Sequence, residues 1–328
     1  MKDFENKKKI ISYFRAKGLD YVSGEGLSEE LGFSRANVWK YMTKLRDEGY
    51  IIEAVPHLGY RLMSSPDKIL PYEIDVDLKT RVFGKTAVHC YDDISSTNNE
   101  AYRLAEEGAG EGALVLAETQ SRGKGRIGRK WVSPKGSGIY MSLILRPDVE
   151  IDEIPSITLV VASAIAKVIR KECSLDAMVK WPNDIFVGGK KVCGILTEMK
   201  AQTDSVDFLI LGIGINVNTS SGKLPPEATS LSTQASKTFD RTILLRRFLE
   251  ELERDYLKFS SNGFAALRDE CRSSSLVLGG RVNVTEHHKR IEGEAVDIDE
   301  KGALIVRTAE GELKRVFSGD VVMCRGKN

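Results

Sequence analysis

The strongest constraint on the fold is a run of apolar segments, joined by very short connections, between residues 177 and 218. Three segments follow one another here, AMVKWPNDIFV, KVCGILTEMK and DFLILGIGINVN, and each reads as a strand. A parallel crossover needs a dozen or more residues, so connections of hairpin length cannot be crossovers. The sequence therefore predicts a largely antiparallel or mixed sheet.

Further strand and helix patterns precede and follow this run. Two more strand candidates, EGALVLAETQ and IYMSLILRP, come before it. The segment IPSITLVVASAIAKVIRKE is apolar and rich in alanine, so we expect a buried helix there. A long amphipathic helix is expected over TILLRRFLEELERDYLKFSSNGF. Residues 84–272 are therefore predicted to form an α+β domain with its helices on one side of the sheet.

The first 64 residues have a different pattern, which predicts a winged helix-turn-helix domain. Two helical stretches end at Gly18 and Gly32, and Ser34 is a good N-cap for a third helix. Two short strand-like pieces then form a hairpin of the size of a wing. The residues of the third helix expected to face the core are Val38, Met42 and Leu45. The residues expected to bind DNA are Ser34, Arg35, Asn37, Lys40 and Lys44, and the exposed side of Trp39 is expected to face outward beside them.

Two further segments complete the predicted domain organisation. Residues 65–83 contain Pro66 and Pro71 and show little periodicity, which predicts a linker. Residues 273–328 consist of short strand-like pieces separated by glycine and acidic turns. That pattern predicts a small C-terminal β-barrel.

Charge and cysteine content limit the class of protein. The chain has 48 Lys and Arg against 47 Asp and Glu, so any nucleic-acid contact needs a local basic patch. The outward face of the third N-terminal helix is polar and basic, which favours DNA over a docked protein as its partner. Five cysteines without C-x-x-C spacing argue for a reducing compartment and against a zinc site. Without a signal-peptide pattern or a membrane-spanning run, we expect a cytoplasmic protein with no membrane partner.

Residues 121–131, SRGKGRIGRKW, combine five basic residues with three glycines and contain a literal G-x-G-x-x-G. A dinucleotide site is not expected, because the proline and glycines that follow leave no room for a helix before the next strand. A P-loop is not expected either, since Arg129 and Lys130 stand where lysine and serine or threonine belong. A nucleic-acid patch would suit the charge, although the N-terminal domain already provides a DNA reader. The stretch best fits a mobile cationic loop that folds over an anionic intermediate.

Three other blocks accompany this loop in the order SSTNNEA, the loop, KWPNDIFVGGKKVCGILTE and GIGINVN. Together the four blocks resemble the biotin–protein ligase family. With the N-terminal helix-turn-helix, the chain resembles the bifunctional members that also act as the biotin operon repressor. The resemblance implies a central ligase domain like that of class II aminoacyl-tRNA synthetases and an SH3-like C-terminal barrel.

The resemblance also implies roles for particular residues. The implied biotin pocket consists of Ser96, Thr97, Asn98, Gln120, Lys124, Gly125, Arg126 and Lys191. The implied nucleotide region includes Arg129, Trp131, Asn183 and Asn216. Arg126 and Lys191 would act in catalysis as cations that neutralise phosphate charge. Asp184 would orient the incoming lysine, help hold Mg²⁺, or serve as a structural acid.

The chain departs from the family pattern in two places. Lys124 stands where the family has the first arginine of an arginine-glycine-arginine segment, which keeps the charge and loses the forked donor. The stretch PPEATSLSTQ lacks the tryptophan on which some members stack adenine. The stacking partner of adenine is therefore left open.

The activity implied by the resemblance proceeds in two steps. Biotin and Mg-ATP would give biotinyl-5'-AMP, and a lysine of a biotin carboxyl carrier protein would then accept the biotin. The adenylate would also be the corepressor for binding to operator DNA as a homodimer. Two alternatives stay open at this point: a DNA-binding biotin sensor without ligase activity, and a lipoate–protein ligase.

Overall fold

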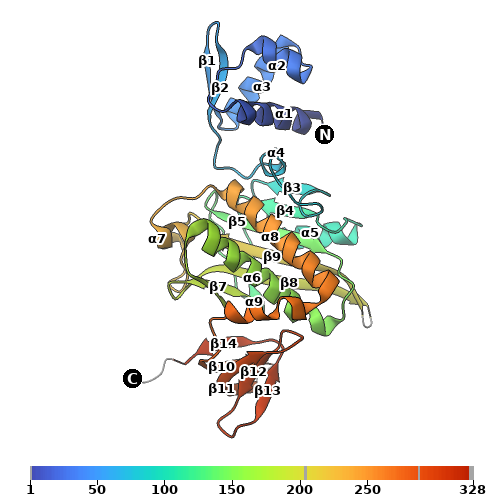
Figure 1. Ribbon diagram of the computed structural model, residues 1–328, viewed down its shortest axis with the longest axis vertical. Helices are drawn as coiled ribbons and strands as arrows, with labels where there is room; N and C mark the ends of the chain where they lie inside the picture. Colours follow the sequence, from blue (N-terminus) through green and yellow to red (C-terminus); the bar gives the residue numbers. More distant parts are fainter. Residues whose placement is uncertain (1, 203–204, 287–288, 325–328) are drawn as a thin grey trace. The chain divides into compact units, whose positions relative to one another are not determined.

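The computed structural model describes residues 2–202, 205–286 and 289–324. The chain forms two compact units, Met1–Leu78 and Lys79–Asn328 (Figure 1). Each unit has its own hydrophobic core, and each is described by itself below. Within the described ranges, no helix is both long and apolar enough to cross a lipid bilayer.

The first unit is the predicted winged helix-turn-helix. Its elements are α1 (Lys2–Lys17), α2 (Gly24–Leu31), α3 (Arg35–Asp47), and the antiparallel strands β1 (Ile51–Val55) and β2 (Gly59–Ser64). The Ser34 hydroxyl accepts a hydrogen bond from the Asn37 amide and so caps α3, as predicted. Val38, Met42 and Leu45 are buried on the inner face of α3, which confirms the expected periodicity.

Residues 65–83 are more ordered than the prediction of a linker with little periodicity. They include a short helix, α4 (Pro71–Asp75), in which Tyr72 and Ile74 are 4% and 0% exposed. The Tyr50 hydroxyl donates a 2.5 Å hydrogen bond to the buried Glu73 carboxylate, which also pairs with Arg15. Residues up to Leu78 are thus part of the first unit. The sequence did not show this because a single helical turn next to two prolines is too short to give a periodic signal.

The second unit is built on a seven-stranded mixed sheet with the strand order β3-β4-β5-β9-β8-β7-β6. These strands are β3 (Val88–Tyr91), β4 (Leu114–Ala117), β5 (Gly138–Leu145), β6 (Ala177–Lys180), β7 (Asp184–Val187), β8 (Lys190–Gln202) and β9 (Ser205–Asn216). Only the β3–β4 pair of this sheet is parallel in the described chain. The mixed, largely antiparallel sheet was predicted, whereas β3 was not.

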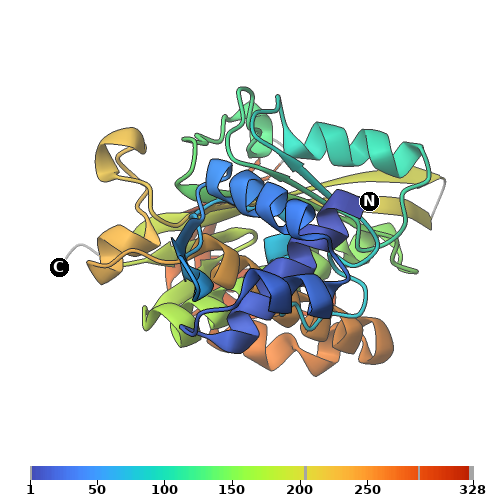
Figure 2. The same ribbon diagram turned by 90° about the horizontal axis from the view of Figure 1, so that it is seen from above.

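Helices cover both faces of this sheet, which corrects the expectation that they lie on one side. The helix α5 (Thr97–Glu106) brings Asn98 against Gly212 of β9. The long helices α6 (Ile154–Cys173) and α8 (Arg241–Asn262) pack together, and Thr158 of α6 lies 2.9 Å from Thr197 of β8. Thr197 pairs with Leu211, whose side chain points to the face opposite that of residue 212. Figure 2 shows α5, in teal, on one side of the sheet and α8, in orange, on the other.

The segment AMVKWPNDIFV, predicted as one strand, forms two. The strands β6 and β7 form a hairpin around Trp181, Pro182 and Asn183, with a cis peptide bond before the proline. Proline has no backbone donor for a sheet ladder, so the chain turns at this position. The turn places Asn183 and Asp184 at the end of the hairpin.

The end of the chain forms a five-stranded antiparallel sheet with the order β13-β12-β11-β10-β14. Its strands are β10 (Arg281–Glu286), β11 (Lys289–Ile298), β12 (Leu304–Arg307), β13 (Leu313–Val316) and β14 (Asp320–Met323). Among the described residues, β13 and β14 are the two edges and do not pair with each other. The buried Trp181 indole donates a 3.1 Å hydrogen bond to the Gly302 carbonyl and so links this sheet to the central domain.

Candidate active site and DNA-binding surface

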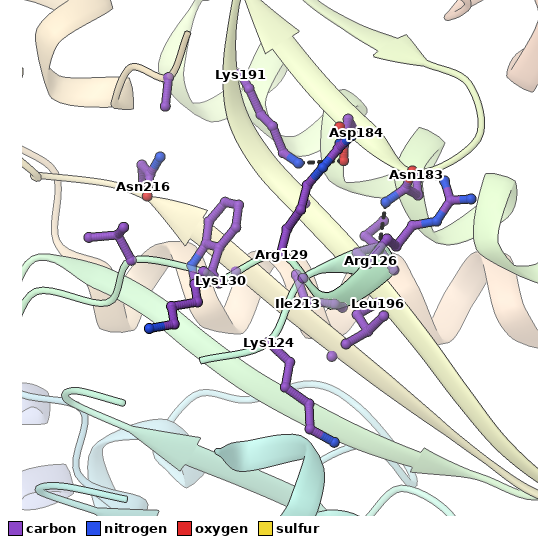
Figure 3. A pocket seen from close by; sticks show the side chains of 18 of the residues that line it. Lys124, Arg126, Arg129, Lys130, Asn183, Asp184, Lys191, Leu196, Ile213 and Asn216 are labelled. Atoms are coloured by element: carbon purple, nitrogen blue, oxygen red, sulfur yellow. Dashed lines mark hydrogen bonds and ion pairs between the residues drawn. The ribbon is translucent and has the colours of Figure 1, made fainter. Parts of the chain in front are cut away.

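A pocket of about 370 Å³ lies on the α5 face of the central sheet. The residues predicted for biotin, nucleotide and catalysis come from five separate segments of the chain, and all of them line this pocket. They are Ser96, Thr97, Asn98, Gln120, Lys124, Gly125, Arg126, Arg129, Trp131, Asn183, Asp184, Lys191 and Asn216. The fold therefore brings together blocks that are far apart in the sequence (Figure 3).

Glycines on β8 and β9 make room for the side chains that line the pocket. A Cβ atom at Gly212 would lie 2.0 Å from Asn98 Oδ1, and one at Gly214 would lie 2.4 Å from the Trp131 ring. Both distances are far below van der Waals contact, so neither position can accept a side chain without moving its neighbour. The Gly-x-Gly of GIGINVN is therefore explained by the close approach of Asn98 and Trp131 to the sheet.

One end of the pocket consists of small polar groups that are buried and hydrogen-bonded to one another. The side-chain oxygen Oε1 of Gln120 accepts a 2.9 Å hydrogen bond from the backbone N–H of Thr97. The Ser142 hydroxyl lies 2.8 Å from Thr97 Oγ1 and 2.6 Å from Asn98 Oδ1, and Asn98 Nδ2 donates to Glu198. These contacts fix the orientation of donors and acceptors before any ligand arrives.

The other end of the pocket is cationic. Lys191 Nζ lies 2.7 Å from Asp184 Oδ1 and 5.4 Å from the centre of the Trp131 ring. The Arg126 guanidinium donates a 2.7 Å hydrogen bond to Asn183 Oδ1. Burial lowers the pKa of Arg126, and the nearby Asp184 partly offsets this effect. An anion bound here would relieve the cost of holding a cation away from water.

Residues 121–131 form the glycine loop, and two of its cations, Lys124 and Arg129, pair with different carboxylates. Lys124 Nζ lies 3.1 Å from Glu198, whereas Arg129 forms an ion pair with Asp320 of β14. Figure 3 shows the Lys124 side chain directed away from Lys191 and Asp184. The loop thus lies across the pocket, with ion pairs to the central sheet and to the C-terminal sheet.

Four charged residues that line the pocket were not assigned from the sequence: Lys130, Lys180, Glu227 and Asp320. Lys180 begins the KWPND block, and burial lowers its pKa although Asp184 acts in the opposite direction. Glu198 does not line the pocket but accepts hydrogen bonds from the pocket residues Asn98 and Lys124. It ends the segment that carries Lys191, so its place in the sequence was a usable signal. Asp320 lies 191 positions from Arg129 along the chain, and nothing in the sequence connects the two.

Three buried polar atoms in the pocket have no hydrogen-bond partner among the described residues: Trp131 Nε1, Asn216 Oδ1 and Asp184 Oδ1. Asp184 Oδ1 is ion-paired with Lys191, so the two unpaired atoms are those of Trp131 and Asn216. Asn216 is only 1% exposed, and its Nδ2 donates to the Thr229 carbonyl. A donor and an acceptor left unpaired in a buried site are costly unless a ligand satisfies them. The segment around PPEATSLSTQ contributes Leu224, Pro225, Glu227 and Ala228 to the pocket wall and no aromatic ring. The aromatic residues that line the pocket are Trp131 and Phe186.

The residues predicted to bind DNA lie on the exposed side of α3, apart from Lys44, which is half-buried. Arg35 forms a 2.6 Å ion pair with Glu25, and Lys44 forms one of the same length with Asp3. The Ser34 hydroxyl is used as the helix cap. Trp39, in contrast, is 65% exposed.

The comparisons with known proteins agree with this architecture. Three family models match the chain: an HTH domain over residues 6–61, the biotin/lipoate A/B protein ligase family over 88–216, and the biotin protein ligase C terminal domain over 277–323. The bifunctional ligase/repressor BirA of Bacillus subtilis is 40% identical over 319 residues, covering 96% of this chain and 98% of that protein. The chain belongs to the family of bifunctional biotin ligase/repressors.

Two further similar proteins extend the comparison. The Escherichia coli BirA is 31% identical over 324 residues, which is 98% of each chain. The structure of the biotin protein ligase from Aquifex aeolicus in complex with biotin and ATP has a TM-score of 0.63 and 31% identity, covering 73% of this chain and 99% of that one. Membership of this family favours the ligase and repressor interpretation over a sensor without activity and over a lipoate ligase.

Proposed function

We propose that this bifunctional ligase/repressor makes biotinyl-5'-AMP in the pocket on the α5 face and transfers biotin to a lysine of a biotin carboxyl carrier protein. The observation that carries the proposal is the arrangement of the pocket. A hydrogen-bonded polar end, a cationic end and two unpaired buried polar atoms share one cavity. Biotin, with a polar ureido ring at one end and a carboxylate at the other, matches the first two features.

In the first step, a carboxylate oxygen of biotin attacks the α-phosphorus of ATP, and the bond to pyrophosphate breaks. Lys191 and Arg126 lie where they can neutralise the carboxylate and the phosphate oxygens on which charge accumulates. Lys191 would exchange its contact with Asp184 for the ligand. Mg²⁺ would be carried mainly by the phosphates, since Mg²⁺ needs only one or two protein carboxylates and Asp184 offers one.

In the second step, the neutral amine of the acceptor lysine attacks the acyl carbon. The amide bond forms, AMP leaves with the electrons of the broken anhydride bond, and the amine loses a proton. Asp184, once Lys191 has turned to the ligand, would orient the incoming lysine. No side-chain nucleophile is required, so the pocket acts through positioning and charge.

The nucleotide would occupy the part of the pocket around Trp131, Asn183 and Asn216. The unpaired Asn216 Oδ1 suits an exocyclic amino group, and the unpaired Trp131 Nε1 suits a ring nitrogen or a phosphate or sugar oxygen. Arg129 would reach the phosphates only after leaving Asp320. Binding of the nucleotide would thus change the contact between the glycine loop and β14.

Exchange of labelled pyrophosphate into ATP tests the first step directly. We expect exchange to require biotin and to fail when lipoate replaces it. Exchange with lipoate alone would indicate a lipoate ligase, and no exchange with either acid would indicate a sensor. Transfer is then measured as biotin bound covalently to a carrier protein and to its lysine-to-arginine variant.

The same intermediate would act as the corepressor for operator DNA. A single helix α3 reads one half-site, so useful affinity needs two copies of the chain. We propose that the adenylate orders the glycine loop and strengthens a homodimer formed through the central sheet, with a coupling of roughly 1–3 kcal/mol. Unbiotinylated acceptor would compete for the same sheet edge. Sedimentation with and without biotin and ATP tests this, and an unchanged monomer–dimer equilibrium together with adenylate-dependent DNA binding would contradict it.

The proposed place of action is the cytoplasm, where the acceptor protein and ATP are found. All five cysteines are unpaired, which agrees with a reducing compartment.

A further inference from the structure

The exposed face of α3 carries a large apolar side chain, Trp39, that is not part of the hydrophobic core of the first unit. Trp39 is 65% exposed, while its neighbours on the inner face, Val38 and Met42, are buried in the core of the first unit. Arg35, Trp39 and Thr43 are spaced four residues apart and therefore lie in one row along the helix. Tryptophan is usually well buried, so its exposure in this row needs an explanation.

The charges around this row are partly compensated within the protein. Arg35 pairs with Glu25 and Lys44 pairs with Asp3, whereas Lys40 forms no ion pair with any residue the structure describes. Such exposed ion pairs are weak, so Arg35 and Lys44 can leave their carboxylate partners and bind DNA phosphates instead. Contacts to phosphate position a protein on the duplex but carry no sequence information. Discrimination between sequences must come from side chains that reach the base edges.

We propose that Trp39 reads thymine in the operator by packing its indole ring against C5-methyl groups in the major groove. The major groove shows this methyl group only at thymine, so an apolar contact there distinguishes A·T from G·C and also fixes the orientation of the pair. The flanking cations give the face the charge that DNA requires. The inference rests on the proposed repressor function, because it assumes that α3 enters the major groove.

The test compares the full-length protein with its Trp39→Ala variant, in the presence of biotin and ATP. The DNA is a duplex selected from a random library with the wild-type chain. Each thymine of this duplex is replaced in turn by deoxyuridine, which removes the methyl group and leaves base pairing unchanged. Ile51→Ala is the matched control, because Ile51 is 61% exposed and lies beyond the C-terminal end of α3.

For the wild type and Ile51→Ala, we expect one or two thymines per half-site at which deoxyuridine weakens binding about fourfold, as for the loss of one buried methyl group. Trp39→Ala should bind the selected duplex roughly tenfold more weakly or worse and should no longer distinguish thymine from deoxyuridine at those positions. Trp39→Phe should restore part of the discrimination. The affinity for non-specific DNA and the salt dependence should stay unchanged, since no charge is removed.

Two results would overturn the inference while leaving the repressor function intact. One is a wild type that is indifferent to every thymine methyl group. The other is a Trp39→Ala variant that keeps the same discrimination as the wild type. Failure of the wild type to select or bind any duplex would instead overturn the repressor function and the inference together. Equal melting temperatures of the wild type and the three variants show that differences arise at the DNA.

Discussion

The pocket of the second unit and the exposed side of α3 in the first unit hold their candidate functional groups in different ways. In the pocket, Thr97, Asn98 and Gln120 are fixed by hydrogen bonds to neighbouring residues and by glycines that allow close approach. On α3, Trp39 and Lys40 are exposed and have few neighbours. The pocket is therefore organised before its ligand binds, whereas the helix surface would gain its contacts only from the proposed operator DNA. The same kind of substitution should have much larger effects in the first region than in the second.

The largest effect is expected at Lys191. Replacing Lys191 by Met removes the cation that faces Asp184 and leaves that carboxylate without its partner. We expect biotin-dependent pyrophosphate exchange to fall by about 10²–10³, as for loss of one group that stabilises charge in a transition state. The control is Lys190→Met, since Lys190 is the exposed neighbour on the same strand. Similar losses in both variants would mean that Lys191 has no special role.

The next effect concerns the shape of the pocket rather than its charge. In Gly214→Ala the added Cβ would lie 2.4 Å from the Trp131 ring, so the indole must move. A displacement of this order at an active site costs roughly 10²-fold in rate. Gly222→Ala is the control, because a Cβ at Gly222 meets nothing within 4 Å. If both variants exchange pyrophosphate at the wild-type rate, Trp131 is not needed in its present position.

Arg126 should affect retention of the intermediate more than its formation. In Arg126→Gly the guanidinium that lies beside Asn183 is lost. The proposed charge-assisted hydrogen bond from this guanidinium to the adenylate, worth about 1.5–3 kcal/mol, is lost with it. We expect the adenylate to dissociate roughly 10- to 100-fold faster and to label lysines of bystander proteins. Gel filtration of the labelled adenylate complex measures the release. Arg122→Gly, which alters an exposed arginine of the same loop outside the pocket lining, should retain the adenylate.

The smallest effect should be confined to the first unit. Glu73→Ala removes the acceptor for the Tyr50 hydroxyl, whose pKa burial raises so that it stays a donor. A buried donor without a partner should lower the free energy of unfolding of this unit by about 2 kcal/mol. Thermal melting and DNA binding would report the loss, while pyrophosphate exchange should stay unchanged. Glu30→Ala, at an exposed acid of α2, should melt like the wild type.

Local signals in the sequence predicted much of the fold. The caps at Ser34 and Gly32 and the inward spacing of Val38, Met42 and Leu45 determine the helix-turn-helix, and each depends on neighbours a few positions away. The pocket residues followed from the resemblance to the family, because their blocks lie close to one another only after folding. Composition and spacing alone could not have placed Ser96 in the same pocket as Lys191.

The features that the sequence did not indicate depend on contacts between distant segments. The helix α4 is held by Glu73, whose partners Tyr50 and Arg15 lie 23 and 58 positions away. Asp320 reaches the glycine loop from the C-terminal sheet. The helix α5 was missed because its start coincides with the Ser-Thr-Asn block, whose residues resemble a loop when read alone.

Separate measurement of the two activities tests the central claim most directly. The chain should be cut after Leu78, since α4 belongs to the first unit and residues 79–328 form the second. A solved ligase that covers only 73% of this chain is matched over 99% of its own length, which favours a ligase fragment shorter than the full chain. We predict that this fragment exchanges pyrophosphate in a biotin-dependent way and transfers biotin to the carrier protein, but does not bind the selected duplex. A folded fragment that has lost exchange, or one that still binds the duplex specifically, would contradict the account.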